Sequence, residues 1–350
     1  MRACAINAAS ISWAQLSLRL SQRFRPRHMY LYLAKVYFFH GMRKPATVIL
    51  VMLACAAAVA QQPSSQSKPE TTLKVDVKLV NVYATVTDLR GSPVAGLKKE
   101  NFRVLEDGHE QTISVFEKES ALPLSIALAI DTSLSTRHDL PLEQASAKRF
   151  ARAIIRPIDA LSVFGFSETV LQSTSYISDL KRIEEGIDHI RLGAATALFD
   201  AVYLASRSLD RRQGRKVMVL ITDGGDTISK VDYKEAARAA EEAEAIVYSI
   251  IVVPIENSAG RETGGEHALI QLSEDTGGKY YYATSMSQLD DAFRQISDEL
   301  RTQYLLAYYP SQRISNSQFR RIQVEVTGPA EASSYHVRHR AGYYTVKSDF

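Results

Sequence analysis

The stretch Ser-Ile-Ala-Leu-Ala-Ile-Asp-Thr-Ser-Leu-Ser at residues 125–135 joins a short apolar run to a turn of carboxylate and hydroxyl groups. A run of this length with no polar face is typical of a parallel strand that is covered on both sides. Similar short apolar runs occupy residues 161–166, 217–221 and 246–253. We therefore expect these four segments to be parallel strands of a sheet that is covered on both faces.

The segments between these runs have the apolar periodicity of helices. Apolar residues recur at helical spacing near 142–155, 180–190, 198–209, 233–243, 268–276 and 289–300. Alternating strands and helices predict an α/β domain over residues 122–301, with a doubly wound and mostly parallel sheet.

The segments on either side of this domain have a β pattern. Apolar and polar residues alternate in both, and Asp107-Gly108 is a hairpin signal. Neither segment alone has enough strands to bury a face. We expect residues 72–118 and 303–350 to form the two parts of one immunoglobulin-like β-sandwich, with the α/β domain inserted between them.

The first 71 residues read as a leader and a linker. Residues 42–60 combine a short basic start, an apolar run and an Ala-x-Ala site, which predicts a secretory signal peptide. A lipid anchor at Cys55 is a weaker alternative, because the preceding residues fit a lipidation box poorly. Residues 61–71 are rich in Gln, Ser and Pro, as expected of a flexible linker. The protein is therefore predicted to be secreted, or periplasmic and envelope-associated, with membrane contact only through the transient signal peptide.

Residues 1–41 have no place in front of a signal peptide. We interpret them as a spurious upstream extension, with translation starting at Met42. An Arg-rich targeting segment is the alternative.

Composition excludes several classes of protein once the leader is set aside. The chain carries 42 Lys and Arg against 39 Asp and Glu, but residues 1–60 hold eight basic and no acidic residues. The remainder has a net charge of 34 − 39 = −5, which gives no support for nucleic-acid binding. Both cysteines, Cys4 and Cys55, also lie in the leader, so Cys-based metal sites and thiol catalysis are excluded from the mature chain.

Three segments bring oxygen donors to the predicted carboxyl edge of the sheet, where doubly wound folds bind ligands. They are Asp131-Thr-Ser-Leu-Ser135, the loop at residues 193–201 with Thr196, and Thr222-Asp-Gly-Gly-Asp226. Carboxylates and hydroxyls are hard ligands suited to Mg²⁺, Mn²⁺ or Ca²⁺. The alternative interpretation is that these residues only cap the helices that follow.

With these motifs, the region from Leu122 to Leu300 resembles a von Willebrand factor type A domain, which implies a Rossmann-like fold with a metal-ion-dependent adhesion site. The resemblance implies that Ser133 and Ser135 bind the metal directly and that Thr196 binds directly or through water. It implies that Asp131 and Asp223 act mostly through water. The segment Gly193-Ala194-Ala195 keeps only part of the family's glycine pair.

The flanking β segments also resemble a narrower group, the secreted acidobacterial proteins with a type A domain. The stretches that carry this resemblance are 82–88, 93–97, 102–108, 304–310 and 338–343.

These features predict a non-enzymatic, adhesion-type binding protein. The ion would keep one coordination position for an acidic group of a protein partner. A metal-dependent enzyme or accessory subunit of the envelope is one alternative, and its nearest candidate bases by sequence are His138 and Asp226. A self-assembling structural envelope protein is the other. No phosphate-binding glycine motif is present, and Ser133 lacks a G-x-S-x-G elbow.

Overall fold

The computed structural model describes residues 79–118, 122–136, 140–253, 263–312, 318–330 and 332–345, apart from the side chains of Ser135 and Thr263. The predicted leader and linker, residues 1–41, 42–60 and 61–71, lie outside this range. No helix in the described part of the chain is both long enough and apolar enough to cross a membrane.

The α/β domain is built on a six-stranded sheet with the order β10-β9-β8-β5-β6-β7. Its strands are β5 (Leu124–Asp131), β6 (Ala160–Phe166), β7 (Val170–Gln172), β8 (Arg215–Thr222), β9 (Ala245–Val252) and β10 (Lys279–Ala283). All neighbours are parallel except β6 and β7, which are antiparallel. Every residue of β5 is buried, as expected for a central strand covered on both faces. The predicted doubly wound, mostly parallel sheet is confirmed.

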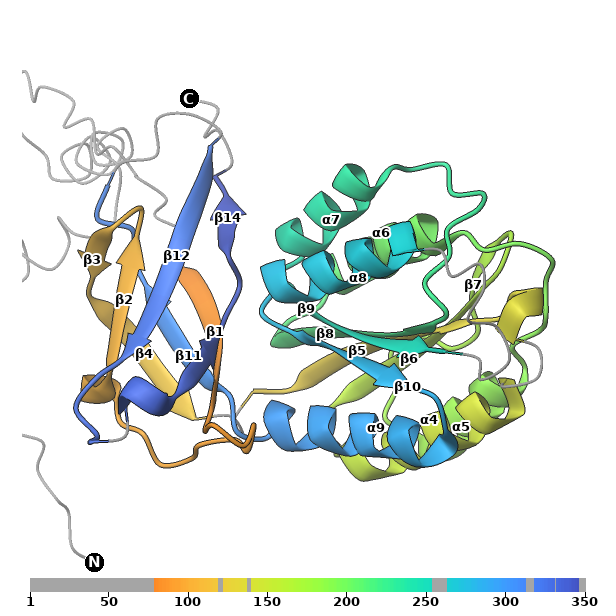
Figure 1. Ribbon diagram of the computed structural model, residues 1–350, viewed down its shortest axis with the longest axis horizontal. Coiled ribbons are helices and arrows are strands. Elements are labelled where there is room, and N and C mark those ends of the chain that lie inside the picture. The colour runs from red at the N-terminus through yellow and green to blue at the C-terminus, as the bar shows by residue number, and fades with distance from the viewer. Residues whose placement is uncertain are drawn as a thin grey trace, which may run out of the picture. The chain divides into compact units, whose positions relative to one another are not determined.

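Three helices cover each face of the sheet (Figure 1). On one face lie α4 (Leu140–Ile154), α5 (Leu180–Asp188) and α9 (Met286–Leu300), and on the other lie α6 (Leu198–Asp210), α7 (Tyr233–Glu242) and α8 (Thr263–Asp275). Side-chain caps fix several of their starts: Asp179, Asp232 and Ser285 each accept a hydrogen bond from a first-turn N–H of α5, α7 and α9. These six helices correspond to the six periodic segments of the sequence.

Helix α8 begins earlier than its apolar pattern predicts. Its first turn, Thr263-Gly264-Gly265-Glu266, contains no apolar residue, so periodicity alone places the start near residue 268. Gly265 packs against the loop after β8, where a Cβ atom would lie 1.5 Å from the carbonyl oxygen of Gly224. Only glycine allows this approach, so the first turn is held by backbone contact instead of apolar packing.

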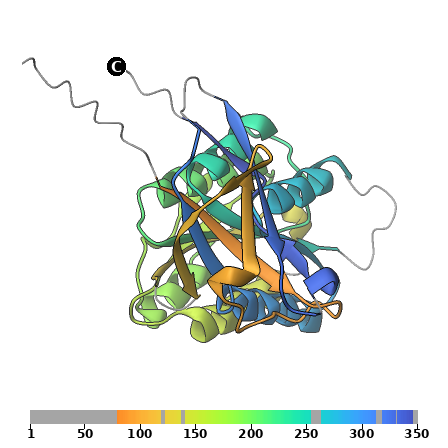
Figure 2. The same ribbon diagram turned by 90° about the vertical axis from the view of Figure 1, so that its left-hand side faces the viewer.

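The two flanking segments share two four-stranded sheets, and both segments supply strands to each (Figures 1 and 2). The first has the order β13-β1-β11-β4, from β13 (His336–Arg338), β1 (Val80–Thr87), β11 (Tyr304–Tyr308) and β4 (Ile113–Lys118). The second has the order β14-β12-β2-β3, from β14 (Gly342–Tyr344), β12 (Phe319–Val326), β2 (Phe102–Glu106) and β3 (His109–Gln111). Apolar residues of both sheets form one core. The narrower assignment to an immunoglobulin-like sandwich stays a prediction.

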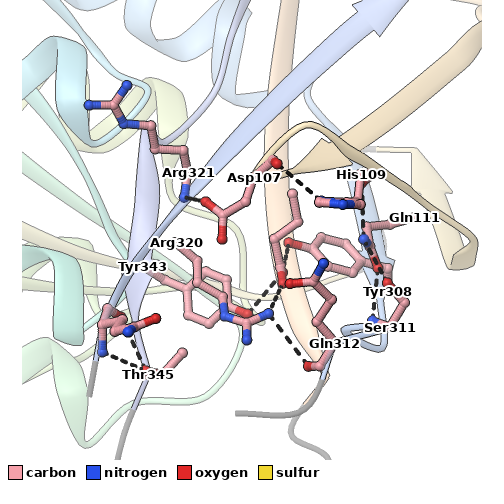
Figure 3. Close-up of polar contacts among 12 residues, drawn as sticks. Asp107, His109, Gln111, Tyr308, Ser311, Gln312, Arg320, Arg321, Tyr343 and Thr345 are labelled. Atoms are coloured by element: carbon pink, nitrogen blue, oxygen red, sulfur yellow. Dashed lines mark hydrogen bonds and ion pairs between the residues drawn. The ribbon is translucent and has the colours of Figure 1, made fainter. Parts of the chain in front are cut away.

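A buried polar cluster joins the second sheet to the first. Glu106, at the end of β2, accepts hydrogen bonds from Tyr308 Oη of β11 at 2.7 Å and Tyr343 Oη of β14 at 2.9 Å, and it forms an ion pair with Arg320 of β12. Figure 3 shows Tyr308, Arg320 and Tyr343 converging on this region. Asp107 follows Glu106 in the β2–β3 hairpin turn, and its Oδ1 accepts from the backbone N–H of Arg321 at 3.0 Å. One N-terminal strand is thereby tied to three C-terminal strands.

The described residues belong to one compact unit, and residues 338–341 make polar contacts with the α/β domain. Arg338 Nη2 lies 2.6 Å from Glu299 Oε1 of α9, and the same guanidinium donates to the carbonyl oxygen of Gly278 at 2.7 Å. The backbone N–H of Ala341 donates to the carbonyl oxygen of Asp275 at 2.7 Å. Helix α7, with its acidic C-terminal turn, lies beside β14.

Glu241 in this region is expected to make stability depend on pH. Burial, followed by the charge of Asp275, raises the pKa of Glu241 to about 7, against the opposing charges of Arg238 and Arg340. A folded-state pKa above the unfolded value means that stability is complete below about pH 4.5 and is lost as pH rises through about 7. Glu241→Gln removes this loss. We expect the variant to unfold close to wild type at about pH 5 and to be more stable by about 1 kcal/mol at about pH 8, allowing for solvent screening.

Urea unfolding at both pH values measures this difference. Glu242→Gln is the matched control, because Glu242 is exposed and pairs with Arg238 at 2.8 Å. It should cost a few tenths of a kcal/mol, roughly equally at both pH values. If Glu241→Gln keeps the pH dependence of wild type, the carboxylate is ionised throughout and the assignment is wrong.

Candidate metal centre

Three loops meet at the carboxyl edge of the sheet, following β5, preceding α6 and following β8. The backbone N–H of Gly193 donates to the carbonyl oxygen of Thr132 at 2.8 Å, which joins the first two loops. The backbone N–H of Thr227 donates to the carbonyl oxygen of Thr196 at 2.8 Å, which joins the second and third. The parallel register of β5 and β8 pairs Ile130 with Ile221, so Asp131 and Thr222 end these strands side by side.

Asp131 lies at the centre of this edge with no exposed surface. Its Oδ1 accepts from the backbone N–H of Ser133 at 2.9 Å, and its Oδ2 accepts from Thr222 Oγ1 at 2.7 Å. Burial raises the pKa of the Asp131 carboxyl to about 6. The hydrogen bonds from Thr222 and Ser133 oppose this shift, and the nearby charge of Asp223 adds to it.

The structure brings four of the five predicted site residues to the same edge. Ser133 is buried beside Asp131, Thr196 is buried in the neighbouring loop, and Asp223 is partly buried, with its Oδ1 accepting from the backbone N–H of Gly225 at 3.3 Å. The side chain of the fifth, Ser135, lies outside the described residues. Their role as metal ligands stays a prediction.

The donor set fits a hard divalent cation. The described contacts of Asp131 and Asp223 are all with hydroxyl and N–H groups, and none is an ion pair with a basic side chain. Two neighbouring carboxylates with hydroxyl partners, and with no basic partner among the described residues, are suited to Mg²⁺, Mn²⁺ or Ca²⁺. Within the described ranges, no three or more His, Cys, Asp or Glu side chains are placed so that they could hold one metal ion. The five predicted ligands would not count as such a group, because only Asp131 and Asp223 among them are carboxylates.

Sequence reasoning missed Glu168, an exposed residue in the turn between β6 and β7. Its Oε2 accepts from the backbone N–H of Ala194 at 2.7 Å, and backbone N–H groups hold its pKa below the ordinary value. A Cβ atom on Gly193 would lie 2.2 Å from both Glu168 Oε2 and Ser167 Oγ. Glycine at 193 therefore lets Glu168 position the loop that carries Thr196. No sequence pattern signals this role, because residues 165–169 read only as a strand end.

Asp226 is one of the two candidate bases for an enzyme at this edge. Its carboxylate instead accepts hydrogen bonds from the start of α6 and from its own loop. Its Oδ1 accepts from the backbone N–H of Leu198 at 2.8 Å and of Phe199 at 3.3 Å, and from Ser229 Oγ at 2.5 Å. It therefore caps α6 from another loop. The other candidate, His138, lies outside the described residues.

Thr222 is a second residue that sequence reasoning did not assign to the site. Its hydroxyl donates to Asp131 and accepts from the backbone N–H of Gly224 at 3.1 Å. Thr222→Val keeps the shape of the side chain but leaves both partners unsatisfied. We expect about 1–3 kcal/mol lower stability and an affinity for Mg²⁺ about tenfold weaker. Thr222→Ser, which keeps the hydroxyl, is the control, and calorimetric titration with denaturant unfolding measures both effects. Equal affinities of the Val and Ser variants would contradict this role.

The same region matches a known family. The family model for the von Willebrand factor type A domain matches residues 125–295. This part of the chain has the von Willebrand factor type A fold. The resemblance inferred from the motifs is thus confirmed for the α/β domain, whereas no comparison supports the narrower acidobacterial group.

Several solved structures resemble the chain at low identity. The type A domain protein of Catenulispora acidiphila is 11% identical, over 79% of this chain and 76% of that one, with a TM-score of 0.46. The conserved hypothetical protein BatB of Bacteroides thetaiotaomicron is 19% identical over 51% and 100%, with a TM-score of 0.42. The pilus adhesin SpaC of Lactobacillus rhamnosus GG is 11% identical over 71% and 42%, with a TM-score of 0.44. No curated protein matches the chain significantly.

Proposed function

We propose that this protein is a secreted or envelope-associated, non-enzymatic binding module. A divalent cation at the carboxyl edge of the type A domain would hold an acidic side chain of a protein partner. The observation that carries this proposal is the buried Asp131 carboxylate, which lies beside Asp223 and Ser133, at the same edge as the loop of Thr196, without a described basic partner. Nucleic acid has no part in this function, and the membrane is involved only through the transient signal peptide.

Each residue of the site would have the role in metal binding that the family resemblance implies. The hydroxyls of Ser133, Ser135 and Thr196 would hold the ion, while Asp131 and Asp223 would balance its charge, mostly through water. Thr222 fixes Asp131, and Glu168 and Gly193 fix the Thr196 loop. The ion would supply positive charge and one open position. Because the remaining ligands are neutral hydroxyls, it would keep more of its charge than in a site of three or four carboxylates, which favours a carboxylate from a partner.

Metal titration combined with partner capture tests the proposal. The purified protein should bind Mg²⁺ and Mn²⁺ in preference to Zn²⁺. Captured envelope proteins should include species retained in Mg²⁺ and released by chelator. Ser133→Ala should weaken Mg²⁺ binding about tenfold or more and abolish the Mg²⁺-dependent retention.

Ser206→Ala is the matched control. Ser206 is buried on α6, and its hydroxyl has no hydrogen-bond partner in the described structure. This variant should bind metal and partner like wild type. A wild-type protein that binds neither Mg²⁺ nor Mn²⁺ at millimolar concentration would show that the edge residues are only helix caps.

A further inference from the structure

Three large apolar side chains stand exposed on the same loops that carry the predicted metal ligands. Leu134 follows Ser133 directly and is 55% exposed. Leu192, in the loop before α6, is 43% exposed, and Ile228, in the loop after β8, is 51% exposed. Each of the three ligand loops therefore presents one large apolar side chain to solvent.

Backbone hydrogen bonds bring the loops that carry these residues together at the predicted site. Leu192 adjoins Gly193, whose N–H donates to the carbonyl oxygen of Thr132 at 2.8 Å, so it lies beside the loop of Ser133. The backbone N–H of Ile228 donates to the carbonyl oxygen of Thr196 at 3.2 Å. We call Leu134, Leu192 and Ile228 the apolar rim.

The fold does not depend on the apolar rim. None of its members belongs to the apolar clusters that the described residues form on either face of the sheet. The loops are held by backbone hydrogen bonds, so polar residues at these positions would leave the same scaffold intact. Several apolar side chains exposed together around a polar site are typical of a surface that a partner covers.

We propose that the apolar rim selects a peptide segment in which an Asp or Glu is flanked by large apolar side chains. This inference rests on the proposed function, because the acidic residue is placed by the metal. The cation attracts the carboxylate, and the rim removes the flanking side chains from water, which adds affinity in proportion to the apolar area covered. An inorganic anion or an acidic sugar has no side chain that could use the rim, so the chemistry favours a protein segment.

Blocked five-residue peptides test this directly. The probes are Gly-Leu-Asp-Leu-Gly, Gly-Ala-Asp-Ala-Gly and Gly-Leu-Asn-Leu-Gly, titrated into the purified protein in Mg²⁺ and in chelator. We expect the leucine-flanked Asp peptide to bind at least about tenfold more tightly than the alanine-flanked one. The Asn peptide and the chelator should abolish binding. Leu192→Ser and Ile228→Ser should each weaken the leucine-flanked peptide several-fold.

Two controls separate the rim from the metal. Mg²⁺ affinity should be the same in the rim variants and wild type, because neither side chain carries a ligand. Ile158→Ser alters a side chain of similar exposure, 56%, that precedes β6 at the opposite edge of the sheet, and it should change nothing.

Each remaining outcome overturns one statement. Suppose that the protein binds Mg²⁺ but binds the two Asp peptides with equal affinity, or binds neither peptide. The apolar rim then does not select this partner. If the rim variants bind the peptide like wild type, the same conclusion follows. If Mg²⁺ instead drives dimerisation in sedimentation experiments, the rim is covered by a second copy of this chain. Failure of Mg²⁺ binding itself would overturn the proposed function.

Discussion

Glu106→Ala is expected to destabilise the β-sandwich by about 3–5 kcal/mol, because it leaves a buried guanidinium without its counter-charge. Glu106 and Arg320 are only 2% and 7% exposed. Alanine also removes the acceptor of the Tyr308 and Tyr343 hydroxyls. The loss falls on strands β2, β11, β12 and β14, which come from both ends of the chain, so the two segments should separate together.

Denaturant unfolding of matched variants measures this effect. Glu110→Ala removes an exposed carboxylate on β3 that pairs with Arg103 at 3.0 Å, and it should cost less than about 1 kcal/mol. The double variant Glu106→Leu with Arg320→Met replaces the pair with apolar side chains and should recover most of the lost stability. Equal costs for Glu106→Ala and Glu110→Ala would mean that the cluster is open to water.

The fold of the α/β domain could be predicted because its signals are local. Runs such as residues 125–130 and 217–221 are short and apolar on both faces, and each became a buried parallel strand. Strand β7 was missed because Val170–Gln172 has three residues and two of them are exposed. The pairing of the flanking segments followed from their small number of strands. The partners of Glu106 could not be found, since Arg320 is 214 positions away along the chain.

Those residues of the candidate site that lie at the ends of strands could be predicted from the sequence. Asp131 and Asp223 follow apolar strands, so the topology alone brings them to one edge. Thr196 has no such strand before it; its loop was included because it precedes a predicted helix, and its role as a ligand came from the family resemblance. Glu168 and Thr222 act through hydrogen bonds within and between loops: Glu168 accepts from the Ala194 N–H, and Thr222 donates to Asp131 and accepts from the Gly224 N–H. Such bonds depend on loop conformations that no periodicity encodes.

Three buried carboxylates in the described part of the chain, Glu106, Asp159 and Asp131, differ in their partners. Glu106 and Asp159 each have an arginine partner: Arg156 Nε lies 2.8 Å from Asp159 Oδ2, and the Asp159 side chain has no exposed surface. Asp131 is equally buried, yet its described partners are a hydroxyl and an N–H of neighbouring loops. A carboxylate that lacks a basic partner lowers the stability of the folded chain unless a cation joins it. This difference separates a structural acid from one suited to a metal.

Asp131→Asn should therefore abolish Mg²⁺ binding without destabilising the metal-free protein. The amide keeps an acceptor for the Ser133 N–H, and it removes a buried charge, so the free energy of unfolding in chelator should stay equal to wild type or rise by about 1 kcal/mol. Saturating Mg²⁺ should stabilise wild type by mass action, by about 2.7 kcal/mol at one hundred times the dissociation constant, and should leave the variant unchanged. Thermal unfolding in chelator and in Mg²⁺ measures both effects. Asp159→Asn is the control: it breaks the ion pair of a buried carboxylate with the half-buried Arg156, so it should lower stability in both conditions and keep the Mg²⁺ shift. A variant at 131 that keeps this shift, or that loses as much stability in chelator as Asp159→Asn, would show that Asp131 is structural and would remove the basis for a metal at this edge.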